Sequence, residues 1–313
     1  MKYFIKRVGF MALTIFAVCA LTFFLMNVIP GGTAKLVLKH TFVGLEESVT
    51  DEQLNQISDK YDLDDPLYLQ FFRWIKEAVL RGDIGTSYVF KKPVLYLLAL
   101  RLPATIQLAM VSMLIAMLAG VSLGIYSAIR ENKISDHILR IVTLFGVSMP
   151  GFWVALLLIL IFSLRLKLVP VTGYGSLENL LLPAAALSLH SVAAVMRVTR
   201  SSMLETLGQE YIRFAKAKGL PLWKIVSRHA LKNAMLPVIT VIGFQMGGLL
   251  GGTVVIEKIF AWPGIGSLLV DSISARDLPV VQGCVLAIVM MFLFVHFLVD
   301  MLYTHLDPRI RYG

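Results

Sequence analysis

Residues 103–129 read PATIQLAMVSMLIAMLAGVSLGIYSAI, a stretch without a single Asp, Glu, Lys or Arg. A helix needs about 20 mostly apolar residues to cross the hydrocarbon core of a bilayer, and this stretch is long enough. The whole chain agrees, because 57% of its 313 residues are hydrophobic and only 16% are charged. Soluble domains carry about 25% charged residues. The sequence therefore predicts an integral membrane protein made of helices.

Five more apolar stretches bring the predicted number of spanning helices to six. They cover residues 9–29, 138–164, 180–196, 234–256 and 280–303. The first follows a basic start, as a signal peptide would, but it is too long for a typical signal h-region and lacks an A-x-A-like cleavage site. We therefore expect a retained helix. The fourth is short and opened by Pro183, while Ser148-Met149-Pro150 interrupts the third.

The distribution of Lys and Arg predicts the orientation of these spans. Segments 1–8, 130–137, 197–233 and 304–313 hold 3, 2, 8 and 2 basic residues, whereas segments 165–179 and 257–279 hold 2 each. Short cytoplasmic loops carry the excess of Lys and Arg, so both termini are expected in the cytoplasm. The net charge of +9 is thus explained by the Lys and Arg of the cytoplasmic segments, and no nucleic-acid partner is expected.

The chain divides into four predicted parts. An N-terminal transmembrane helix (1–30) precedes an external subdomain (31–94), a transmembrane domain (95–303) and a cytoplasmic tail (304–313). Helices are expected over 51–60, where Thr50 and Gln53 resemble a capping box, and over 67–80. Cys19 and Cys284 lie in apolar stretches, so we expect two buried thiols and no disulfide.

The cytoplasmic segment 197–233 is the most informative part of the chain. One short helix is expected over 210–218, with Lys216 and Lys218 in its last turn and Gly219 as the residue that ends it. A second helix opens near Pro221. The segment is either a topology signal lying against anionic lipid or a docking knob for another protein. The close spacing of Ala215, Ala217 and Gly219 favours docking, since small residues let a partner approach the backbone.

Several motifs in this segment and beyond it resemble a known family. Ala215-Lys-Ala-Lys-Gly219 and Arg228-His229-Ala-Leu-Lys-Asn233-Ala-Met-Leu-Pro237 resemble the coupling loop of ABC importer permeases. The match is closest to the first permease of the pair in the dipeptide/oligopeptide/nickel family. Gly146-Val-Ser-Met-Pro-Gly-Phe-Trp153, Gly251-Gly-Thr-Val-Val-Ile-Glu257 and Phe260-Ala-Trp-Pro-Gly-Ile-Gly266 are also family-like, and the similarity covers nearly the whole chain.

This resemblance implies an all-α type I ABC importer permease fold with six transmembrane helices and an external subdomain after the first. It also implies contact with an ATPase through the coupling loop, by the residues Arg213, Ala215, Ala217, Gly219, Arg228, His229, Asn233 and Pro237. Arg213 stands where the general family motif has Glu, which leaves its part in the contact open.

The resemblance also implies the partners and the place of the protein in the cell. A second homologous permease, two ATP-binding subunits and an extracytoplasmic solute-binding protein are expected, in the inner membrane of a bacterium or archaeon. No Gly-x-x-x-x-Gly-Lys-Ser/Thr motif occurs, so the chain is not expected to be an enzyme; ATP and Mg would bind the partner subunits.

The expected cargo is a dipeptide or oligopeptide, and nickel, free or chelated, is the alternative. A stand-alone secondary transporter and a scaffold or receptor without transport are alternatives of another class. Residues expected along the translocation path or its gate are Met149, Pro150, His190, Gln245, Glu257 and Trp262. His190 is either a packed core histidine or a contact of the cargo, and with nickel it would be a ligand, since imidazole suits that metal. Trp262 is alternatively an interfacial anchor.

Four glycines crowd the fifth span, at positions 247, 248, 251 and 252. Small residues often mark the close approach of two transmembrane helices. They are equally compatible with a wall that faces the pore, so both interpretations stay open.

Overall fold

The computed structural model describes residues 2–28 and 65–306, and its described part is helical apart from loops and one isolated bridge between Thr86 and Pro93. Two compact units arise, each from discontinuous pieces of the chain. The first combines residues 1–103 with 264–291, and the second combines 104–263 with 292–313. The predicted helix over 51–60 and its capping box lie outside the described residues.

The first unit is held together by two apolar clusters. Its helices are α1 (Lys2–Val28), α4 (Leu67–Arg81), α12 (Ile265–Ser274), the start of α5 (Val94–Ile129) and the first half of α13 (Leu278–Leu306). Phe71 of α4 is buried against Cys19 and Phe23 of α1. Helix α4 ends at Gly82, whose φ of +66° is a left-handed cap, so the helix predicted over 67–80 is confirmed.

The second unit contains most of the membrane domain. It comprises most of α5, then α6 (Ile134–Ser148), α7 (Gly151–Leu158), the π-helical turn η1 (Ile159–Arg165) and α8 (Leu177–Leu207), followed by α9 (Glu210–Ala217), α10 (Leu222–Lys224), the π-helical turn η2 (Ile225–Ala230), α11 (Leu231–Ile259) and the end of α13. Its main core joins α5, α7, α8 and α11. A second core lies under α9 and η2.

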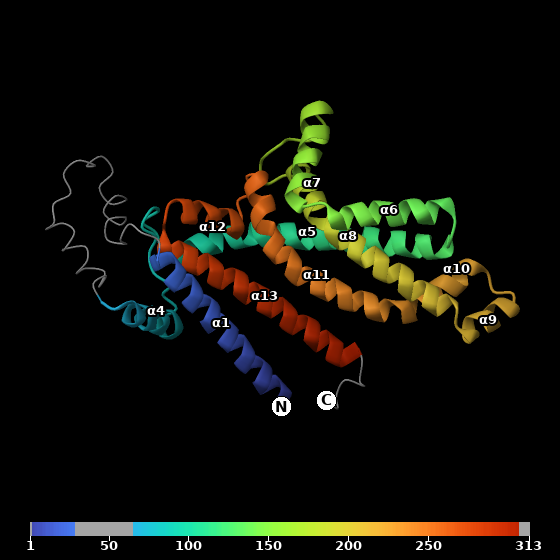
Figure 1. Ribbon diagram of the computed structural model, residues 1–313, viewed down its shortest axis with the longest axis horizontal. Coiled ribbons are helices and arrows are strands. Elements are labelled where there is room, and N and C mark those ends of the chain that lie inside the picture. Colours follow the sequence, from blue (N-terminus) through green and yellow to red (C-terminus); the bar gives the residue numbers. More distant parts are fainter. Residues whose placement is uncertain (1, 29–64, 307–313) are drawn as a thin grey trace. The chain divides into compact units, whose positions relative to one another are not determined.

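Four described helices are long and apolar enough to span a membrane: α5, α8, α11 with the helical residues before it, and α13. Helix α1 has a shorter apolar stretch, Gly9–Leu25. The interruption expected in the third span is confirmed, because α6 and the α7–η1 helix meet at an angle of 109°. Figure 1 shows α7 turning sharply away from α6. The break falls at Met149 and Pro150, since proline lacks the N–H that a continuous helix requires.

The fourth span is longer than expected. Helix α8 runs without a break from Leu177 to Leu207 and contains Pro183 in its second turn. Its N-terminus is capped by the Ser176 side chain, which accepts a hydrogen bond from the Asn179 N–H. The helix therefore continues well past residue 196, and the segment that connects it to α11 is shorter than the predicted 197–233.

Candidate functional site

Helices α9 and α10 with η2 form a compact knob at the ends of α8 and α11, as Figure 1 shows. The expected short helix is confirmed, since α9 covers Glu210–Ala217. Gly219 turns the chain with a φ of +76°, which L-residues with a side chain rarely adopt. The second helical piece begins after Pro221, also as expected.

The knob has an apolar core of its own. Ile212 and Ala215 of α9 are buried against Ile225, Val226 and Ala230 of η2. Ala215 therefore serves the packing of the knob, whereas Ala217 and Gly219 are exposed and remain accessible to a partner. The predicted small-residue face is thus split between an inner and an outer side.

The outer surface of the knob is aromatic as well as basic. Phe214 and Trp223 are 65% and 70% exposed, and the Lys218 ammonium lies 5.1 Å from the Phe214 ring centroid. Arg213 is exposed on the same short helix. Exposed aromatic and basic side chains are the residue types that dominate protein interfaces. The sequence reasoning missed Phe214 and Trp223, although aromatic residues at polar positions of a short amphipathic helix were the available signal.

The remaining predicted coupling residues lie beyond the knob core. Arg228 and Pro237 are exposed and His229 is half-buried. The Asn233 side-chain amide donates a hydrogen bond of 2.8 Å to the Tyr211 hydroxyl, which ties the start of α11 to α9. Asn233 therefore stabilises the contact between α9 and α11 within this chain.

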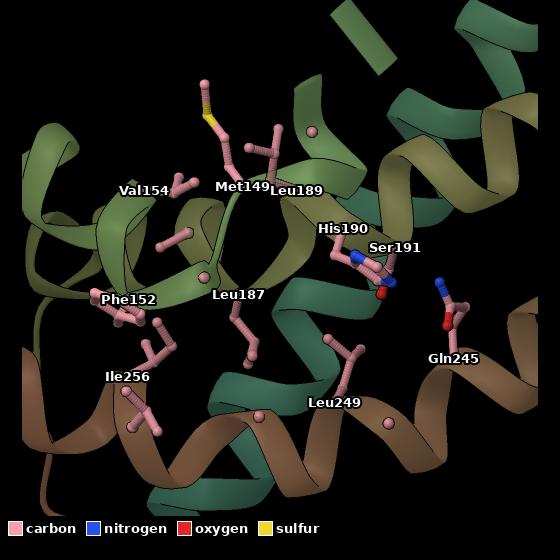
Figure 2. A pocket seen from close by; sticks show the side chains of 16 residues that line it. Met149, Phe152, Val154, Leu187, Leu189, His190, Ser191, Gln245, Leu249 and Ile256 are labelled. Atoms are coloured by element: carbon pink, nitrogen blue, oxygen red, sulfur yellow. The ribbon is translucent and has the colours of Figure 1, made fainter. Parts of the chain in front are cut away.

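A cavity of about 430 Å³ lies between the α6–α7 break, α8 and α11. Figure 2 shows it with its sixteen lining residues. Met149, His190 and Gln245, which the sequence reasoning put on one path, all line this cavity. Pro150 belongs to the break that shapes its wall. Gly248 and Gly252 line it too, and a Cβ would meet no atom within 4 Å on Gly248, would lie 3.2 Å from Leu187 Cδ1 on Gly252, and would collide with His296 on Gly247. Close helix packing is therefore confirmed at Gly247, while a wall that faces the pore stays a prediction for Gly248.

The cavity is almost entirely uncharged. Among the lining residues, none is Asp, Glu, Lys or Arg, and the hydrogen-bonding side chains are His190, Ser191 and Gln245. His190 is exposed in this chain, so the interpretation of His190 as a packed core histidine is wrong. No group of three or more His, Cys, Asp or Glu residues suited to a metal ion occurs in the described part of the chain.

Glu257 and Trp262 do not line this cavity. Both are buried, at 0% and 1% exposure, and each is held by a hydrogen bond to α5. Thr105 donates to the Glu257 carboxylate at 2.8 Å, and the Trp262 indole N–H donates to the Ala104 carbonyl at 2.9 Å. The alternative that Trp262 is an interfacial anchor is wrong, because its ring is enclosed and contacts Tyr174 edge-on.

Comparison with known proteins identifies the family. The family model described as "Binding-protein-dependent transport system inner membrane component" matches residues 120–312, and its N-terminal companion matches residues 1–109. The chain belongs to this family. It is thus the inner-membrane permease component of an ABC importer, which works with ATPase and solute-binding partners and has no ATPase site of its own.

Two curated relatives from Escherichia coli K12 cover the full length of this permease. A probable D,D-dipeptide transport system permease protein, DdpB, is 38% identical over 98% of this chain and 97% of its own length. A glutathione transport system permease protein, GsiC, is 38% identical over 100% of this chain and 99% of its own. Membership in the family removes the stand-alone secondary transporter from consideration.

Proposed function

We propose that this permease forms half of the translocation pathway of an ATP-driven peptide importer. A second homologous permease supplies the other half, two ATP-binding subunits attach on the cytoplasmic side, and an extracytoplasmic solute-binding protein delivers the cargo. ATP and Mg bind the partner subunits, with no cofactor on this chain. The complex resides in the cytoplasmic membrane of a bacterium or archaeon, with both termini of the permease in the cytoplasm.

The observation that carries the choice of peptides is the uncharged cavity between α8 and α11. Its apolar wall and three neutral hydrogen-bonding side chains suit a cargo with amide groups and variable side chains. The relatives named for D,D-dipeptide and glutathione transport point the same way, since both compounds contain amide bonds.

Nickel has less support as a cargo. His190 is the one imidazole among the lining residues, and Figure 2 shows the Met149 side chain directed away from it. A transition metal requires several ligands at once. The test measures the uptake of a labelled dipeptide and of labelled nickel by cells that carry the whole complex. Both uptakes are compared between the wild-type permease and the His190→Ala variant. We expect dipeptide uptake, and no nickel uptake that depends on His190. Nickel uptake abolished by His190→Ala, without dipeptide uptake, would overturn the choice.

The knob of α9, α10 and η2 is the proposed docking surface for the ATP-binding subunit. Its exposed Phe214, Trp223 and Arg213 supply the contact, and Gly219 sets the turn that presents them. Gly219→Leu forces a side chain into a left-handed conformation. We expect co-purification of the ATP-binding subunit to be lost, while insertion in the membrane persists.

A matched control exists in the same chain. Gly175 also has a positive φ, +97°, and a Cβ on either glycine meets no atom within 4 Å. Gly175→Leu therefore introduces comparable strain outside the knob, and the ATP-binding subunit should still co-purify. Equal behaviour of the two variants would count against docking at the knob.

A further inference from the structure

Three polar side chains face the cavity from two helices. His190 and Ser191 are neighbours on α8, and Gln245 lies on α11. Figure 2 shows the Gln245 amide across the cavity from this pair, with Leu249 one turn further along α11. The other lining residues are apolar or glycine, so these three supply the directional hydrogen bonds available to a molecule in the cavity.

The hydrogen-bonding capacity of this cluster is unused within the chain. The Gln245 amide nitrogen is closed off from solvent and has no hydrogen-bond partner among the described residues, so a rotation of its side chain is needed to bring it to a molecule in the cavity. No side-chain hydrogen bond of His190 or Ser191 occurs within the described part of the chain. Buried polar groups in folded proteins are nearly always paired, so an orphaned amide on a cavity wall indicates a missing ligand group.

The chemistry of that missing group follows from the donor. The amide nitrogen of Gln245 can only donate, so its partner is an acceptor oxygen. With no charged side chain on the wall, the site binds a neutral dipole in preference to an ion. The apolar wall next to it, including Leu187 and Leu249, accepts side chains of differing shape without directional contacts.

We infer that Gln245, His190 and Ser191 bind the main chain of a peptide during its passage, with the Gln245 amide N–H donating to a peptide carbonyl oxygen. This inference rests on the proposed peptide transport. A main-chain contact is common to all peptides, and one neutral hydrogen bond is weak enough for the cargo to leave, as a transport pathway requires. The site would thus recognise peptides as a class and leave selection among them to the solute-binding protein.

The experiment uses the whole complex reconstituted in liposomes with its solute-binding protein. Gln245→Leu keeps the approximate size and removes the amide, and Thr240→Val removes a polar group from the same helix outside the lining of the cavity. For a radiolabelled alanine tripeptide below saturation, we expect Gln245→Leu to lower the transport rate about fivefold to tenfold, the worth of one hydrogen bond. Thr240→Val should transport at nearly the wild-type rate, and ATP hydrolysis stimulated by the binding protein should persist in both.

A second measurement separates a contact with the cargo from a change in structure. In a depsipeptide analogue one amide is replaced by an ester, whose carbonyl is a weaker acceptor. The wild type should prefer the amide several-fold, and Gln245→Leu should lose that preference whatever its overall rate. The binding protein affects both complexes equally, so its own preference cancels in the comparison.

The outcomes distinguish the inference from the proposal beneath it. An amide-to-ester ratio that is unchanged in Gln245→Leu would overturn the main-chain contact while leaving peptide transport intact. A transport rate that Gln245→Leu lowers only for peptides with a free C-terminus, and not for their C-terminal amides, would assign Gln245 to the terminal carboxylate and also overturn it. A wild-type complex that hydrolyses ATP and moves no peptide would refute the proposed function itself.

Discussion

Gly247 is a residue whose lack of a side chain allows two helices to meet. A Cβ built at this position of α11 collides with the His296 ring of α13, which itself stacks on Phe292 with ring centroids 4.1 Å apart. Gly247→Ala should therefore destabilise the permease by about 1–3 kcal/mol, as overpacking of a tight contact does. The measurement is the thermal unfolding midpoint of the purified complex in detergent.

Two variants check the cause of that loss. His296→Ala removes the colliding ring, so the double variant Gly247→Ala/His296→Ala should regain stability relative to Gly247→Ala alone. Gly248→Ala adds the same methyl group next door, where no atom of this chain lies within 4 Å, and should have little effect. A Gly248→Ala variant as unstable as Gly247→Ala would refute the explanation.

Single residues also mark the limits of what the sequence predicts. Gly219 is confirmed as a left-handed turn, because a glycine after a short amphipathic helix is a local signal. Glu257 and Trp262 were expected along the translocation path or its gate, and the structure buries them against Thr105 and Ala104, far earlier in the chain. A contact across that sequence distance leaves no local pattern. The unpaired amide of Gln245 is equally invisible until its surroundings are known.

At the scale of elements, a buried ion pair fastens α6 to α8. Asp136 is fully buried and accepts two hydrogen bonds of 2.7 Å from the Arg200 guanidinium. It also accepts from the Ser127 hydroxyl at the end of α5 and from the Asn132 N–H in the following turn. One carboxylate thus joins three helices beside the part of α8 that leads into the knob.

Breaking this pair should be costly. Arg200→Ala leaves the buried carboxylate without its counter-ion, and removal of one partner from a buried pair costs about 3–5 kcal/mol. We expect a strongly reduced amount of assembled complex in the membrane, measured by quantitative immunoblotting and co-purification. Arg197→Ala changes an exposed arginine of the same helix and should be tolerated. Equal tolerance of both changes would show that the pair contributes little.

The same ion pair explains why the end of α8 was misjudged. Residues 197–207 contain two arginines and several hydroxyl residues, which is the composition of a loop. In the fold, Arg200 is neutralised by Asp136 and Met203 is buried, so the helix continues to Leu207. Similarly, Pro150 predicted a break in the third span, but the 109° angle results from packing of α7 on α8 and α11, which no local sequence encodes.

At the scale of the whole molecule, membrane character and helical class were predictable because they depend on composition and on the length of apolar runs. The number of crossings depends on geometry as well. Four helices qualify as spans and α1 has a shorter apolar stretch, while the bent pair α6 and α7–η1 decides how the chain is threaded. If that pair did not cross, residues 165–179 would share a side with residues 130–137. The knob would then face away from the cytoplasm, where no ATP-binding subunit can reach it.

Cysteine labelling in intact cells tests this threading. The native Cys19 and Cys284 are buried, so background labelling by a membrane-impermeant maleimide should be low. Leu177, at the start of α8, is 79% exposed, and Lys218 is exposed on the knob. We expect Leu177→Cys to react from outside and Lys218→Cys to react only after the membrane is permeabilised, because the bent pair crosses the bilayer and the Lys- and Arg-rich segments stay in the cytoplasm. Labelling of Lys218→Cys from outside, with Leu177→Cys protected until the membrane is permeabilised, would show that the bent pair does not cross, and it would contradict the six-span topology and, with it, the cytoplasmic docking surface.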